Sequence, residues 1–411
     1  MMPTILCLLV PIASLMLAGL VVRGVLARGK ALDEAAWLQV PFIGVAVNVL
    51  ILQFQLYLNI PVKRGVIALW AILLVFAGAW LLWGKVKDSF RQVPILPFAI
   101  AGLVLLIQSV GLIRVGPQDY AGRSWPDQFN YIVMAEYFRG TGFDVEYGTL
   151  GQQAWLARVP DLKNRRIGQS VLHAYHGVIT RMDTRSQFMP TILLACPLIA
   201  LALFAVGRRL GLASSQAALA GLFGGLAPGI SLLVQESFLS HAYGIPLLFM
   251  LPVVLSIHNS DRSVTSLLTA VLFLGALASL YSEFLMMELA MVGAFFVLTL
   301  IQGSRQRRHC LSYLVLLAAP WLCNPLYTEL TTILTIPYMT TPGLLSHVYP
   351  WAYDAVGFGV LWCGDKCVMP GVSESLEPLA TAVGLTIAIG GALGLAALTL
   401  GGVRRWWRGE R

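Results

Sequence analysis

A short segment in the middle of the chain carries the residue types that acid–base chemistry needs. Residues 124–140 place Asp127 and Tyr131 four residues apart. Pro126 suits the first turn of a helix, Asp127 lies where the helix dipole favours an anion, and Gly140 suits the end. We therefore predict a helix here. Asp127 is either only the acid of that first turn or a general base that deprotonates an acceptor hydroxyl or amine.

The same predicted helix is amphipathic. Because residues three and four apart share a face, an apolar stripe follows Asp127 along the helix. A helix of this kind lies on a membrane with its apolar face down and would hold Asp127 at the rim. Asp119 is the second candidate for a catalytic carboxylate, and Arg123 is a candidate for substrate binding. The residues of this face, which is apolar except at its beginning, are Asp127, Tyr131, Met134, Ala135 and Phe138.

Three cations lie within four residues later in this segment: Lys163, Arg165 and Arg166. Lys and Arg bind phosphate through charge-assisted hydrogen bonds, which are bidentate for Arg. One interpretation is a clamp that stabilises the charge of a polyprenyl-phosphate leaving group. The other is binding to anionic lipid headgroups.

His173 and His176 follow at a spacing of three residues, so both lie on one helix face. We consider them candidates for hydrogen bonding to a substrate or for contact with lipid headgroups. A zinc pair is the alternative, but no third ligand is evident.

The elements that must position these residues are membrane spans. Of the 411 residues, 57% are apolar and 12% are charged, whereas soluble domains have about 25% charged residues. This composition excludes a soluble enzyme, a disordered tail and a nucleic-acid-binding module. It predicts an all-α polytopic membrane protein, since several apolar stretches match the thickness of a bilayer core. The eleven predicted spans are approximately 4–26, 36–58, 65–84, 94–113, 189–207, 212–233, 238–257, 264–281, 283–302, 310–326 and 378–402.

Positive charge alternates between the connections and so predicts the orientation. One set of alternate connections, which includes the C-terminal tail, holds most Lys and Arg residues, whereas the opposite short connections hold only Lys63 and Arg64, and the segment 327–377 holds only Lys366. The tail is therefore predicted to be cytoplasmic, with the N-terminus and two long loops, 114–188 and 327–377, outside. Long ordered loops are usually functional, so we expect the chemistry at the outer face of a plasma membrane or bacterial inner membrane.

Polar residues also gather at the predicted outer ends of later spans. Ionisable groups at membrane depth usually face a cavity or a partner. We expect them to line a common substrate site beneath the first loop, and interhelical hydrogen bonding is the alternative. The candidates are Gln235, Glu236, His241, Tyr281 and Glu283.

Two cysteines of the second outer loop, Cys363 and Cys367, lie four residues apart. On an oxidising face such a pair is expected to form a small disulfide loop, and a redox or metal pair is the alternative. We expect no cofactor. A divalent metal is not favoured, because Asp127 is followed by Gln128 and not by a second acid.

The pattern Asp-x-x-x-Tyr-x-x-x-Ala, formed by Asp127, Tyr131 and Ala135 in the first large outer loop, resembles the GT-C superfamily of membrane glycosyltransferases. It is most similar to the branch with the protein O-mannosyltransferases and the aminoarabinose transferases that modify lipid A. The resemblance implies a helical bundle whose first outer loop carries interfacial helices. It also implies inverting transfer of a sugar from a polyprenyl-phosphate carrier to an acceptor at the outer face.

On that resemblance Asp127 would be the general base and Tyr131 a wall of the site. Gln128 departs from the family, which often has a second acid at this position. Residues 1–93 would be three additional N-terminal transmembrane helices, and 94–411 would form the shared bundle.

Two other functions fit the same sequence. Gln128 and the additional N-terminal spans also suit a non-catalytic subunit of a larger membrane complex. Stretches interrupted by Gly and Pro, such as 222–229, suit a lipid or solute transporter, although the polar residues gather at the outer edge and not at the midplane. The expected partners are a polyprenyl-phosphate-sugar donor, an acceptor glycan, lipid or protein, anionic lipids and other membrane subunits.

Overall fold

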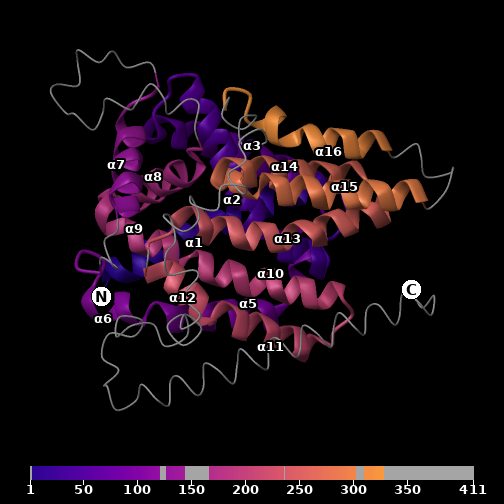
Figure 1. Ribbon diagram of the computed structural model, residues 1–411, viewed down its shortest axis with the longest axis horizontal. Helices are drawn as coiled ribbons and strands as arrows, with labels where there is room; N and C mark the ends of the chain where they lie inside the picture. Colours follow the sequence, from indigo (N-terminus) through magenta and orange to yellow (C-terminus); the bar gives the residue numbers. More distant parts are fainter. Residues whose placement is uncertain (1, 121–125, 144–165, 236, 302–309, 328–411) are drawn as a thin grey trace, which may run out of the picture.

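The computed structural model describes residues 2–120, 126–143, 166–235, 237–301 and 310–327. Within these ranges every regular element is a helix, which confirms the all-α prediction for the described part of the chain. The helices form one bundle (Figure 1). They are α1 (Met2–Leu26), α2 (Glu34–Tyr57), α3 (Val62–Trp83), α4 (Val86–Arg91), α5 (Ile95–Gln108), α6 (Val110–Val115), α7 (Pro126–Gly140), α8 (Gly168–Thr180), α9 (Thr184–Leu193), α10 (Ala195–Arg209), α11 (Ser214–Gly225), α12 (Pro228–Gln235), α13 (Leu239–Asp261), α14 (Val264–Leu280), the 3₁₀ helix η3 (Ser282–Phe284), α15 (Leu285–Ile301) and α16 (Cys310–Cys323).

Six helical segments in the described residues are long and apolar enough to cross a membrane, so the protein is membrane-embedded. Three more apolar helices, α5, α14 and α16, are shorter. The predicted span 212–233 is two helices, because α11 ends at Gly225 and α12 begins at Pro228. The predicted span 378–402 lies outside the described residues, so the count of eleven stays a prediction. The six segments are Thr4–Leu26, Glu34–Tyr57, Val62–Trp83, Thr184–Arg209, Leu239–Asp261 and Ser282–Ile301.

Helix α2 lies in the interior of the bundle and contacts α1, α3, α8, α10 and α14. Apolar residues predominate on every side of it, as expected of a helix with neighbours all around it. Its first turn is capped by Asp33, whose Oδ1 accepts a hydrogen bond from the Ala36 amide at 2.8 Å. The helices of residues 1–93 share one hydrophobic core with those that follow. They are built into the bundle, and the domain boundary at residue 93 stays a prediction.

Helices α1 and α2 touch backbone to backbone. A Cβ atom added at Gly19 would overlap the carbonyl oxygen of Val40, and one added at Gly44 would overlap the carbonyl oxygen of Leu15. Small residues allow such close approach between membrane helices. The crossing depends on glycine at both positions.

The two ends of the bundle differ. Helices α7, α8, α9 and α12 gather at one end, on the left in Figure 1. At the other end the Thr265 hydroxyl donates to the Leu26 carbonyl at 2.5 Å, and Arg208 pairs with Glu34 at 3.0 Å. The first end corresponds to the predicted outer face and the second to the predicted cytoplasmic face. We call them the outer end and the basic end, and the orientation in the membrane stays a prediction.

Helix α7 forms where the sequence predicts it, but its apolar face does not face a membrane surface. Tyr131, Ala135 and Phe138 are buried, and α7 packs mainly against α8. This corrects the expectation of an interfacial helix with that face on lipid. The physical reason is that the buried side chains of α8 and α9 supply the apolar surface that a bilayer was expected to supply.

Candidate functional site

Residues that the sequence singled out in separate segments meet at the outer end of the bundle. They come from α7, from the segment before α8, from the first turn of α13 and from the turn between α14 and α15. We call this group, together with its neighbour Ser240, the Arg166 cluster. Its members are Tyr131, Arg166, Ser240, His241, Tyr281 and Glu283.

Arg166 is at the centre of the cluster. Its Nη1 donates to Glu283 Oε2, and its Cζ lies 5.0 Å from the centre of the Tyr281 ring. Burial lowers the pKa of Arg166, but the Glu283 charge, followed by Tyr131, Tyr281 and Tyr327, raises it above its ordinary value. Arg166 is therefore a permanent cation, held between an acid and the face of an aromatic ring.

Tyr281 is positioned by α13. Its hydroxyl lies 2.5 Å from His241 Nε2, and the two ring centroids are 4.2 Å apart. Gly244 lies one turn after His241, and a Cβ there would be only 2.8 Å from Tyr281 Cβ. Because Gly244 has no side chain, Tyr281 can pack against α13 and reach the histidine.

A buried polar network holds the end of α14 that precedes Tyr281. Gln53 of α2 donates to Asn324 Oδ1 at 2.9 Å and to the Tyr57 hydroxyl at 2.7 Å. The Ser279 hydroxyl donates to Gln53 Oε1. Polar groups in a helical bundle are commonly satisfied by such interhelical bonds. The network ties α14 to α2 and so anchors the turn that carries Tyr281 and Glu283.

Hydroxyl groups surround the guanidinium of Arg166. Tyr131 shares a 2.7 Å hydrogen bond with Ser240, and the Tyr327 hydroxyl donates to Ser282 Oγ at 2.7 Å. Ser282 in turn donates to Glu283 Oε2 at 3.3 Å. A guanidinium with several hydroxyls nearby can bind a phosphate and the hydroxyls of a sugar.

Asp127 is the second residue of α7, one turn before Tyr131, so its backbone lies on the part of α7 that reaches the cluster. Its side chain lies outside what the structure describes. Asp119 is exposed in a turn after α6, and no contact in the described residues links it to the cluster. The other candidates outside the described part are Arg123, Lys163, Arg165, Glu236, Cys363, Cys367 and the side chain of Gln235.

His173 and His176 lie elsewhere. Both are fully buried in α8, where His173 Nε2 is 2.7 Å from the Thr184 carbonyl and His176 Nδ1 is 3.2 Å from Thr191 Oγ1. Burial lowers the pKa of His173 to about 4, and burial together with His173 lowers that of His176 to about 3. Such contacts join α8 to α9 and favour packing over substrate binding. In the described residues no group of three or more His, Cys, Asp or Glu side chains could hold a metal.

Tyr327, near the outer end, was not among the sequence candidates. Tyr327 contacts Ser282, and the available signal was its place at the outer end of the predicted span 310–326. Glu288 is fully buried in α15, and neither carboxylate oxygen has a hydrogen-bond partner in the described residues. No hydrogen bond or ion pair in the described part of the chain connects it to the Arg166 cluster.

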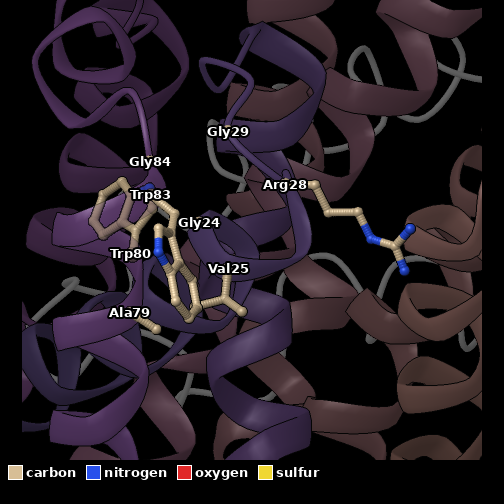
Figure 2. Close-up of a pocket in the computed structure, with 8 residues that line it drawn as sticks. All are labelled: Gly24, Val25, Arg28, Gly29, Ala79, Trp80, Trp83 and Gly84. Atoms are coloured by element: carbon tan, nitrogen blue, oxygen red, sulfur yellow. The ribbon is translucent and has the colours of Figure 1, made fainter.

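A cavity of ≈ 370 Å³ lies at the basic end, between the last turns of α1 and α3. Figure 2 shows the rings of Trp80 and Trp83 on one side of it, and the Arg28 side chain pointing away from them. The cavity is at the opposite end of the bundle from the Arg166 cluster, because the start of α14 contacts α1 here and Tyr281 follows the other end of α14. It is therefore separate from the candidate site.

The candidate site is identified from the geometry of the Arg166 cluster alone. No protein-family model, curated protein or solved structure matches this chain.

Proposed function

We propose that the protein transfers a sugar from a polyprenyl-phosphate donor to an acceptor at the outer face of the membrane, with inversion at the anomeric carbon. The observation that carries the proposal is that Arg166, Tyr281 and Glu283 meet Tyr131, one turn from Asp127, at one end of a membrane-embedded bundle. A cation that can bind phosphate thus lies beside α7, the helix whose first turn carries the candidate base Asp127.

Each group of residues has its own role in the proposed transfer. Arg166 binds the donor phosphate and stabilises the negative charge that develops when the bond between the anomeric carbon and the phosphate oxygen breaks. Hydroxyl groups of Tyr131, Tyr281 and Ser240 contact the sugar. Asp127 takes the proton from the acceptor as it attacks the anomeric carbon from the side opposite the leaving phosphate, which produces inversion.

The test is mass spectrometry of lipids retained by the purified protein, with wild type beside Asp127→Asn. The wild type is expected to retain polyprenyl phosphate, and the variant is expected to accumulate the sugar-loaded carrier, because transfer stops before the donor is consumed. Transfer should fall by at least about 100-fold, the usual contribution of a general base. Glu136→Gln is the matched control, since Glu136 lies on the same helix and its side chain is 58% exposed.

The other outcomes decide against parts of the proposal. Unchanged transfer by a folded Asp127→Asn variant would show that Asp127 is not the base. Ordinary phospholipid alone in every sample, together with stable co-purifying chains, would show a non-catalytic subunit. Substrate counterflow in vesicles that is insensitive to Asp127→Asn would show a transporter.

A further inference from the structure

The Arg166–Glu283 ion pair leaves most of the guanidinium unused. A guanidinium has five N–H donors and can bind a phosphate through two parallel hydrogen bonds. In the described residues the Arg166 guanidinium has one hydrogen-bond partner, Glu283, to which it donates through Nη1. The Arg166 side chain is 26% exposed and that of Glu283 is 48% exposed. An anion arriving from outside the bundle can therefore reach the pair.

Within this ion pair, Arg166 is held more firmly in place than Glu283. Arg166 lies over the ring of Tyr281, which in turn contacts His241 and packs against Gly244. Glu283 belongs to a 3₁₀ helix of three residues, and its carboxylate is held by Arg166 and by one 3.3 Å bond from Ser282. If one partner moves, it is therefore Glu283, while the guanidinium stays on its aromatic platform.

From this arrangement, and resting on the proposed function, we infer that Glu283 and the lipid phosphate bind Arg166 in exchange. In the unliganded protein the Glu283 carboxylate occupies a donor of Arg166 that the phosphate of the carrier takes when it binds. Two anions on one partly buried cation repel each other, so the carboxylate is displaced. The same exchange in reverse expels the carrier phosphate after transfer. Glu283 thus sets the affinity for the carrier without taking part in the bond changes.

The experiment measures binding of a polyprenyl phosphate to the full-length protein in lipid nanodiscs, with the uncharged polyprenol as the probe for the tail alone. Glu283→Gln keeps the shape of the side chain and removes its charge, so it is expected to tighten binding of the phosphate about tenfold. Arg166→Gln is expected to weaken it about tenfold. The double variant should bind no more tightly than Arg166→Gln, because Glu283 acts through Arg166. None of the variants should change binding of the polyprenol.

Glu136→Gln is the matched control. Glu136 also pairs with an arginine, Arg139, at 3.5 Å on α7, but outside the cluster. Its loss should leave binding unchanged, which separates a local effect of Glu283 from a general loss of negative charge at this end of the bundle.

The outcomes separate this inference from the proposed function. Unchanged or weaker phosphate binding by Glu283→Gln, with weaker binding by Arg166→Gln, would overturn the exchange and leave the transferase proposal intact. A lower melting temperature of Glu283→Gln in that case would identify the pair as a structural tie. Binding that is insensitive to Arg166→Gln would overturn the exchange as well. Tighter binding by Glu283→Gln without any sugar transfer would support the exchange while the transferase proposal fails.

Discussion

At the scale of single residues, burial decides what a titratable side chain can do. Arg166 keeps its charge because Glu283 and three tyrosines surround it. His173 and His176 lose theirs because they lie in a fully buried packing layer between α8 and α9. Titratable residues of one predicted loop, 114–188, therefore serve either the candidate site or the packing of the interior. The distinction follows from the environment and not from the residue type.

The two buried histidines predict a pH dependence of stability. Their folded-state pKa values, about 4 and about 3, lie below the ordinary value of 6.5. The unfolded chain therefore binds more protons below pH 6.5, so stability is complete above that pH and is lost as the pH falls towards 4. We expect the melting temperature in detergent to drop by about 5 °C between pH 7.5 and pH 5.

Scanning calorimetry of the wild type and of a His173→Asn, His176→Asn double variant measures this effect. The variant should be less stable at pH 7.5 but should show a smaller drop with pH. Equal pH dependence of the two proteins would show that these histidines are not the cause. Asp183, whose pKa is lowered by its bonds to Ser186 although burial acts to raise it, loses its contribution only at lower pH, so it does not interfere.

At the scale of elements, glycine positions set how closely helices approach. Gly44 of α2 touches the backbone of α1, whereas a Cβ at Gly78 of α3 would meet nothing within 4 Å. Both are glycines inside apolar helices, and composition alone does not separate them. Their difference lies in what the neighbouring helix brings to the position.

This contrast predicts opposite effects of the same substitution. Gly44→Ala should destabilise the protein by about 2 kcal/mol or more, because the methyl group overlaps the Leu15 carbonyl and α1 must move away. Gly78→Ala should be neutral or stabilising by up to about 1 kcal/mol, since alanine is the better helix former. Melting temperatures of the two purified variants measure the difference. A Gly44→Ala protein as stable as wild type would show that the two helices do not cross this closely.

At the scale of the whole molecule, the two ends of the bundle carry different chemistry. The outer end holds the Arg166 cluster, and the basic end holds the pairing of Arg208 with Glu34 and the tryptophan-lined cavity. The alternation of positive charge predicts which end faces the cytoplasm. The proposed reaction requires the Arg166 cluster to face the other side.

Cysteine labelling tests the orientation. In a background with the native cysteines replaced, Arg185→Cys places an exposed thiol at the outer end and Lys87→Cys places one at the basic end. A membrane-impermeant maleimide added to intact cells should label position 185 and should label position 87 only after the cells are opened. The opposite pattern would invert the topology and would contradict a reaction at the outer face.

The sequence by itself determined the class of the protein and several of its spans, and it singled out Tyr131, Arg166, His241, Tyr281 and Glu283 as candidates. Apolar length is a local property, so segments such as Glu34–Tyr57 and Leu239–Asp261 could be located without tertiary information. The helix from Pro126 to Gly140 was predicted for the same reason, from its first-turn residues and its terminal glycine.

Only the tertiary structure decided which side chains meet. Arg166 and Glu283 are 117 residues apart in the chain, and no local pattern links them. Tertiary packing also reversed two expectations. The apolar face of α7 packs against α8 and not against lipid, and His173 and His176 lie in the interior of the protein. Periodicity reports that a face is apolar but not what will cover it, since covering depends on the distant segments that the fold brings against it.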